Sequence, residues 1–293
     1  MILASSEFLF AKALWAALLI GLLLPVLGRN LVLGRTILLG LAIPQIAMAG
    51  IAFVFLGHAL EWKWALPFEE DSTKALVGSL LFGLPGLILV AAPWQRRSGL
   101  SEAWLAFLYL ASVAATNLML SNDAVGETYL SDLFHGRLLF ISEETLRLLA
   151  VVLCSAAFLA LAMRRRLLLV LTDPDYAVVS GLRVGAWTLL GTLLSGTTIG
   201  VTVAAAGPLV TFAFLVLPVL AAGSLASSLR ANLWLSMAIG LLTAWAGFHI
   251  SYHHDLPLGD TVVAAGCGSL LLAKGIGLLR SACSRLLAAR SGK

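Results

Sequence analysis

Long uncharged stretches alternate with short polar connectors along almost the whole chain. Nine apolar segments can be drawn, each near the ~20 residues that an α-helix needs to cross a bilayer. The pattern therefore predicts an all-α fold, a polytopic membrane helix bundle of 8–9 transmembrane helices in a single domain over residues 1–293. Eight is the count if one segment is re-entrant. The segments are 8–27, 36–56, 75–94, 101–120, 145–163, 186–206, 208–228, 231–252 and 261–279.

The connector from residue 172 to 184 is too hydrophilic to lie in lipid and follows a triplet of arginines. Pro174 stands between two aspartates where a helix would start, and Gly181 stands where it would stop. These signals predict a short capped helix on the membrane surface, at about residues 173–183. Such a helix on the positive side of a transporter would dock a motor protein; an ordinary interfacial connector is the alternative. The predicted docking residues are Asp173, Pro174, Tyr176, Ala177 and Gly181.

The connectors also separate by charge. Basic residues follow the odd-numbered segments, whereas most acidic residues lie in the other connectors. Because Lys and Arg are enriched in the cytoplasmic loops of membrane proteins, this alternation predicts a multi-pass chain with its N-terminus outside. The C-terminal tail, residues 280–293, is then cytoplasmic. The basic residues that fix this orientation include Arg29, Arg35, Arg96, Arg97, Arg164, Arg165, Arg166, Arg183, Arg230 and Arg280.

Composition supports a membrane protein and excludes several other classes. The chain is 60% apolar with a mean hydropathy of +0.98, whereas soluble domains are about 45–50% apolar. The net charge of +4 comes from scattered loop residues, so nucleic-acid binding is not expected. The three cysteines show no C-x-x-C spacing, and no basic residue precedes the first apolar run, which argues against a thiolate metal site and a cleaved signal peptide. No nucleotide-binding G-x-x-x-x-G-K-[ST] run occurs, so we expect a transport subunit and not an enzyme.

Few polar side chains interrupt the apolar segments, and these mark candidate positions for a transport path. Gln45 follows Pro44 near mid-bilayer in the second segment, and Asn117 lies within the fourth. Because an uncompensated polar group is costly in lipid, each should face protein or a water-filled path. The Ala-Gly-Pro run at 206–208 should break the chain between the sixth and seventh segments. We predict a translocation pathway at Gln45, Met48, Asn117 and Thr198; packing between helices would also account for these residues.

Histidines gather at the end of the eighth segment. His249 and His253 are four residues apart, so they share one helix face at a spacing that lets two imidazoles grip one metal ion. Asp255 follows closely, and imidazole suits zinc, copper and iron. We therefore predict a metal site at His249, His253 and Asp255 near the outer membrane face, with a solvated helix end as the alternative.

Several stretches resemble the permease subunits of metal-ion ABC importers, the family that carries zinc, manganese or chelated iron. Residues 173–181 show its Asp-Pro-x-x-Ala-x-x-x-Gly run, followed by Leu-Val-Leu-Pro at 215–218. Ser-Glu-Ala at 101–103 and Asp-Leu-Phe-His-Gly at 132–136 look like the same family. Ser-Tyr-His-His-Asp-Leu-Pro at 251–257 is similar to its Ser-Tyr-x-x-Asp-Leu-Pro signature. The resemblance covers nearly the whole chain in the expected order.

This resemblance implies an ABC-transporter transmembrane domain in the bacterial cytoplasmic (inner) membrane. Such a domain imports zinc, manganese or iron, or a metal chelate, by alternating access and without a permanently bound cofactor. The implied partners are a second copy of the chain, a dimeric ABC ATPase on the coupling helix, a periplasmic or extracellular solute-binding protein and membrane lipid. One departure concerns the ion site. The family's second helix carries an Asp and a His in a Gly-Asp-x-x-x-His run, and the matching positions here are Leu41 and Gln45.

Two further functions stay open. The missing Asp and His leave room for the same architecture with a non-metal or otherwise different cargo. A secondary transporter driven by an ion gradient is the other alternative. Such proteins usually bury ionisable residues in the middle of their helices, and this chain has almost none beyond His249, Lys12 and Lys274.

Overall fold

In the computed structural model the described residues are 2–33, 37–60, 71–91, 101–121 and 137–291, and within these ranges every regular element is a helix. This confirms the prediction of an all-α, polytopic membrane bundle. The helices are α1 (Ile2–Leu33), α2 (Ile37–Ala59), α3 (Asp71–Ala91), α4 (Ser101–Leu120), the 3-10 turn η2 (Arg137–Phe140), α6 (Glu143–Ala162), α7 (Arg164–Thr172), α8 (Pro174–Val179), α9 (Val184–Leu225), α10 (Leu229–His254) and α11 (Leu258–Ser291).

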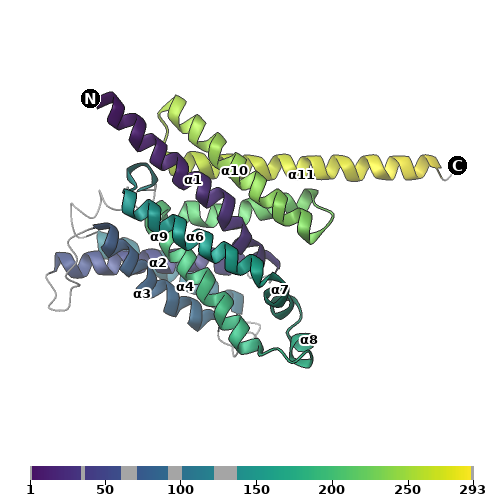
Figure 1. Ribbon diagram of the computed structural model, residues 1–293, viewed down its shortest axis with the longest axis horizontal. Helices are drawn as coiled ribbons and strands as arrows, with labels where there is room; N and C mark the ends of the chain where they lie inside the picture. The colour runs from purple at the N-terminus through teal and green to yellow at the C-terminus, as the bar shows by residue number, and fades with distance from the viewer. Residues whose placement is uncertain (1, 34–36, 61–70, 92–100, 122–136, 292–293) are drawn as a thin grey trace.

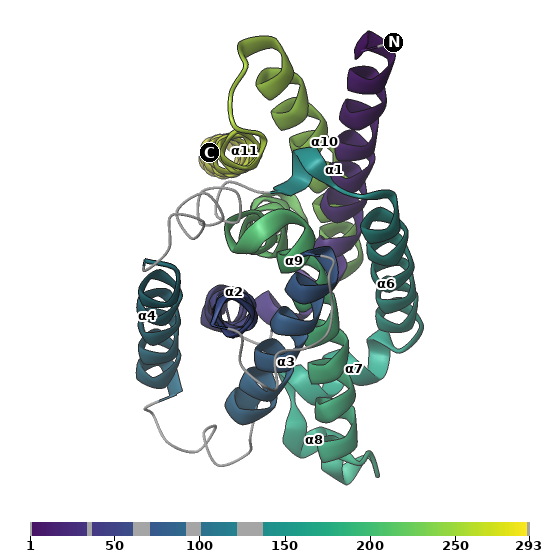
Figure 2. The same cartoon turned by 90° about the vertical axis from the view of Figure 1, so that its left-hand side faces the viewer.

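The long helix α9 occupies the centre of the bundle and packs against α1, α2, α3, α6, α10 and α11 (Figure 2). At Gly207 its backbone leaves the helical region, with φ 81° and ψ 166°. Figure 1 shows the chain turning back there, so that both ends of α9 lie toward α7 and the start of α10. The Thr211 hydroxyl donates to the Gly207 carbonyl at 2.7 Å. The predicted break at residues 206–208 is therefore confirmed.

The predicted membrane segments coincide with the observed helices. Among the described residues, seven helices are long and apolar enough to span a membrane. One of these is α9, which holds two predicted segments in its 42 residues. The third predicted segment is α3, which is not among the seven. At the C-terminus, α11 continues to Ser291, so most of the predicted tail is a helical extension that projects beyond the bundle (Figure 1).

Glycines allow pairs of helices to pack with their backbones in direct contact. A Cβ placed on Gly28 of α1 would lie 1.8 Å from the Leu215 carbonyl oxygen of α9. A Cβ on Gly240 of α10 would lie 2.0 Å from the carbonyl oxygen of Gly21. Because lipid offers little hydrophobic force between helices, this close van der Waals contact is a main source of bundle stability.

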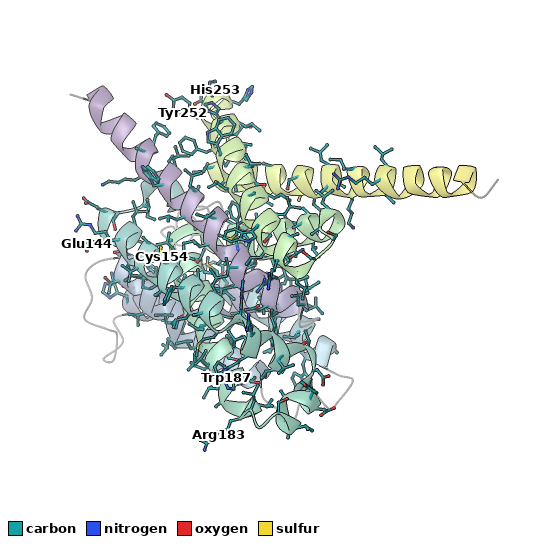
Figure 3. All side chains as sticks on the ribbon, turned by 45° about the vertical axis from the view of Figure 1, so that its right-hand side comes forward. Glu144, Cys154, Arg183, Trp187, Tyr252 and His253 are labelled. Atoms are coloured by element: carbon teal, nitrogen blue, oxygen red, sulfur yellow. The ribbon has the colours of Figure 1, made fainter. Side chains whose placement is uncertain are left out.

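The two ends of the bundle differ in charge. Arg183 and Trp187 lie at the end formed by α7 and α8, whereas Tyr252 and His253 lie at the opposite end (Figure 3). Arg164, Arg165 and Arg166 begin α7, and Arg183 directly precedes α9. We call the end that carries α7 and α8 the basic end.

Candidate functional site

Two short helices, α7 and α8, connect α6 to α9 at the basic end (Figure 1). Asp173 separates them, and its Oδ1 accepts a hydrogen bond from the Tyr176 backbone N–H at 3.0 Å. Pro174 takes the first helical position, where its missing N–H costs nothing. The predicted short helix is thus present as Pro174–Val179, while α7 was not anticipated as a separate element.

The end of α8 is fixed by two backbone hydrogen bonds. The N–H of Gly181 donates to the Val178 carbonyl and that of Leu182 to the Ala177 carbonyl, each at 3.0 Å. This is a Schellman arrangement, which requires a left-handed residue after the helix. Gly181 supplies it with φ +76°, and a Cβ there would meet nothing within 4 Å. The left-handed conformation of this turn therefore favours glycine at position 181.

Helix α8 packs one side against the rest of the chain and exposes apolar side chains on its surface. Ala177 is fully buried and holds the helix against the rest of the chain. Tyr176, Val178 and Val179 are 59%, 62% and 84% exposed. The structure therefore brings the five predicted docking residues into one compact motif and adds two valines that the sequence reasoning missed. The sequence could have indicated these two valines, because apolar residues are unexpected in a polar connector.

The four predicted pathway residues occupy different environments. Met48 and Thr198 are fully buried, and the Thr198 hydroxyl donates to the Leu194 carbonyl of its own helix at 2.7 Å. Gln45 is partly buried, and its Oε1 is enclosed without a hydrogen-bond partner. Asn117 is exposed on α4, which packs on α2 at the edge of the bundle (Figure 2). Of these four residues, only Gln45 therefore presents a buried polar atom without a hydrogen-bond partner.

The outer cluster contains interacting rings rather than a set of convergent ligands. The His249 and His253 rings meet edge to face with centroids 4.7 Å apart. His253 Nδ1 lies 3.0 Å from the His249 carbonyl oxygen. Across the described ranges, no three His, Cys, Asp or Glu side chains gather closely enough to hold a metal ion. The chain by itself therefore does not bring His249, His253 and Asp255 together as a preformed site.

Asp255 has a clear role in ending α10. It is the residue after His254, and it adopts a left-handed conformation with φ 50° and ψ 39°. The Ser251 hydroxyl donates to the Leu256 carbonyl at 2.7 Å, and the Leu256 N–H donates to the Ser251 carbonyl at 3.2 Å. Ser251, Asp255 and Leu256 thus build the turn between α10 and α11. Aspartate tolerates this backbone better than most residues.

Comparisons with known proteins agree with this architecture. Residues 5–275 match the family model described as "ABC 3 transport family". The manganese transport system membrane protein MntB of Synechocystis sp. is 26% identical over 260 residues, which are 88% of this chain and 79% of that protein. A Haemophilus influenzae protein named "Probable iron transport system membrane protein" is 25% identical over 254 residues, with 86% and 88% covered. The fold is similar to a chain of PsaBC from Streptococcus pneumoniae in complex with Fab, with a TM-score of 0.72 and 20% identity over 90% of each chain.

Proposed function

Because the chain belongs to the ABC 3 transport family, we propose that it is the membrane-spanning subunit of an ATP-driven importer of a divalent transition metal or its chelate. Two relatives that match most of the chain are named for manganese and iron transport. In this proposal the chain performs alternating access as a homodimer in the bacterial inner membrane, with its C-terminus in the cytoplasm. A separate ATPase supplies the energy, and an external solute-binding protein delivers the cargo.

The geometry of α8 is the observation that carries this proposal. A coupling element must transmit force, so it must be rigid and must expose a surface for its partner. Hydrogen bonds fix both ends of α8, and the burial of Ala177 anchors its middle. Tyr176, Val178 and Val179 remain exposed at the basic end, where they would enter a groove on the ATPase.

The composition of the central helices bears on the cargo. Neither α2 between Ile37 and Gly57 nor any part of α9 contains an acidic residue, a histidine or a cysteine. Mid-membrane ligands for a bare divalent cation are therefore absent from both helices, and the Gln45 amide oxygen is the polar atom that α2 offers there. A metal that arrives with its own organic ligands needs no charged side chain at this depth. This favours a chelate over a bare ion.

Elemental analysis of cells grown in chelator-limited medium tests the proposal. Strains lacking this permease, its ATPase or both should show the same selective drop in one metal, restored by the wild-type chain. No change in any metal would assign the architecture to a non-metal cargo. Metal uptake that survives loss of the ATPase but collapses with a protonophore would instead identify a secondary transporter.

A further inference from the structure

The joint between α6 and α7 carries a concentration of positive charge, and within the described ranges no ion pair joins an acidic side chain to its arginines. Helix α7 opens with Arg164, Arg165 and Arg166, has no side-chain cap and has no acidic residue in its first turn. The N-terminus of a helix is itself electropositive, so an anion is favoured there over further cations. Among the backbone hydrogen bonds of turns, loops and caps in the described part of the chain, none uses the N–H of Arg164 or Arg165.

A fourth arginine is buried behind this joint. Arg29, near the end of α1, is 3% exposed, and its Nε is enclosed without a hydrogen-bond partner. Arg164 lies within electrostatic reach of Arg29, and because both side chains are positive, they repel each other. The end of α1 and the start of α7 lie side by side in Figure 1 and are in contact. A buried charge left without a counter-charge is strongly destabilising, so the site calls for an anion.

The outer face of α6 leads directly to these arginines. Leu148, Val151 and Phe158 are 39%, 68% and 71% exposed and follow one side of the helix. Figure 2 shows α6 on the flank of the bundle, and only Met163 separates it from Arg164. An apolar stripe that ends in a phosphate-binding group matches the two parts of a phospholipid, whereas a free phosphate would need no stripe.

We propose that Arg29, Arg164, Arg165 and the N-terminus of α7 bind the phosphate headgroup of an anionic phospholipid, whose acyl chains lie along α6. The phosphate oxygens accept from the exposed guanidinium of Arg165, from Arg164 and from the backbone N–H groups that begin α7. Its negative charge offsets that of Arg29 behind them. Arg166 serves a different purpose, since its guanidinium carbon lies 5.4 Å from the centroid of the Trp187 ring. Clusters of this kind at the cytoplasmic membrane face recognise anionic lipids by charge.

The lipid would join α1 to α7, and α8 follows α7 after a single residue. Its binding would therefore stiffen the base of the coupling helix. This inference does not depend on the cargo, because the readout is lipid binding and not transport.

The test uses the purified full-length chain in detergent and in nanodiscs. Native mass spectrometry measures retained lipid, and thermal melting measures stabilisation by added phosphatidylglycerol, phosphatidylcholine or inorganic phosphate. The double variant Arg164→Ala/Arg165→Ala is compared with Arg230→Ala, which removes an exposed arginine of the same end outside the joint. We expect the wild type and Arg230→Ala to retain phosphatidylglycerol, and the double variant to bind it about 25-fold more weakly, from about fivefold for each arginine.

Arg29→Leu keeps the proposal testable if the double variant does not fold. Removal of the buried charge should raise the melting temperature in lipid-free detergent and reduce the further rise that phosphatidylglycerol gives. Equal stabilisation by phosphatidylcholine would overturn the proposal, as would equal lipid affinity of the double variant and Arg230→Ala. Stabilisation by inorganic phosphate alone would assign the site to a soluble anion. If the double variant no longer binds the ATPase but still binds phosphatidylglycerol, the arginines contact a protein partner, and the proposed lipid site is wrong.

Discussion

Replacement of Gly181 tests whether docking of the ATPase depends on the backbone conformation at the end of α8. Because a Cβ at this position would meet nothing within 4 Å, Gly181→Ala imposes only the cost of the left-handed backbone. That cost is about 1–2 kcal/mol for an ordinary L-residue. Since 1.4 kcal/mol is a factor of ten in an equilibrium constant, docking of the ATPase should weaken about 5- to 30-fold. Gly181→Asn should lose less, because asparagine enters this conformation more readily, and Gly181→Arg should abolish docking by adding bulk beside the exposed valines.

The assay is a titration of the purified ATPase onto the labelled full-length permease. Affinity should fall in the order glycine, asparagine, alanine, arginine. Thermal melting should show an intact bundle in all four proteins, since Gly181 lies in an exposed turn. Gly275→Ala on α11, another position where a Cβ meets nothing, is the matched control and should bind normally. Equal binding by the glycine and alanine proteins would refute the conformational argument, and normal binding by the arginine variant would remove α8 from the docking surface.

Three further perturbations test the packing, the pathway and the outer cluster. Gly28→Ala should lower the free energy of unfolding by about 3 kcal/mol or more, because its Cβ would overlap the Leu215 carbonyl. Gly275→Ala should leave the free energy of unfolding unchanged. Equal melting temperatures of the two variants would show that α1 can move away from α9 at no cost. Gln45→Met should leave stability unchanged or raise it by up to about 1–3 kcal/mol, because it removes an enclosed, unpartnered oxygen; a loss of uptake in this folded variant supports a pathway role, and normal uptake argues against one. Asp255→Asn keeps a side chain that tolerates the left-handed turn but removes the carboxylate. Metal-stimulated ATPase activity should fall in this variant if Asp255 is a ligand, and unchanged stimulation would leave it only its turn-forming role.

Local sequence patterns were sufficient for most of the fold. The apolar segments matched the observed helices because span length and hydropathy are properties of neighbouring residues. The break in α9 was predictable from Gly207 and Pro208, which lie next to each other in the sequence. The cap at Asp173 and the left-handed Gly181 were predictable for the same reason.

The sequence could not predict features that depend on contacts between distant parts of the chain or on the local backbone conformation. The burial of Arg29 depends on how α1, α7 and α9 pack together, which no local pattern encodes. The prediction of a pathway at Gln45, Met48, Asn117 and Thr198 rests on their positions within apolar segments, and their exposures differ widely. Asp255 was interpreted by its charge, while its left-handed conformation shows a turn-forming role. The pathway and metal assignments remain predictions.

The sharp turn inside α9 has a consequence for how the chain enters the membrane during synthesis. Both ends of α9 lie on the side of the arginines, and the turn at Gly207 contains no polar loop. Insertion of this 42-residue unit therefore moves no charged residue across the lipid. The two halves can enter together as one helical hairpin, with the Thr211 hydroxyl already occupying the carbonyl that the turn exposes. The most buried helix of the bundle can thus be inserted without moving a charged residue or a polar loop across the membrane.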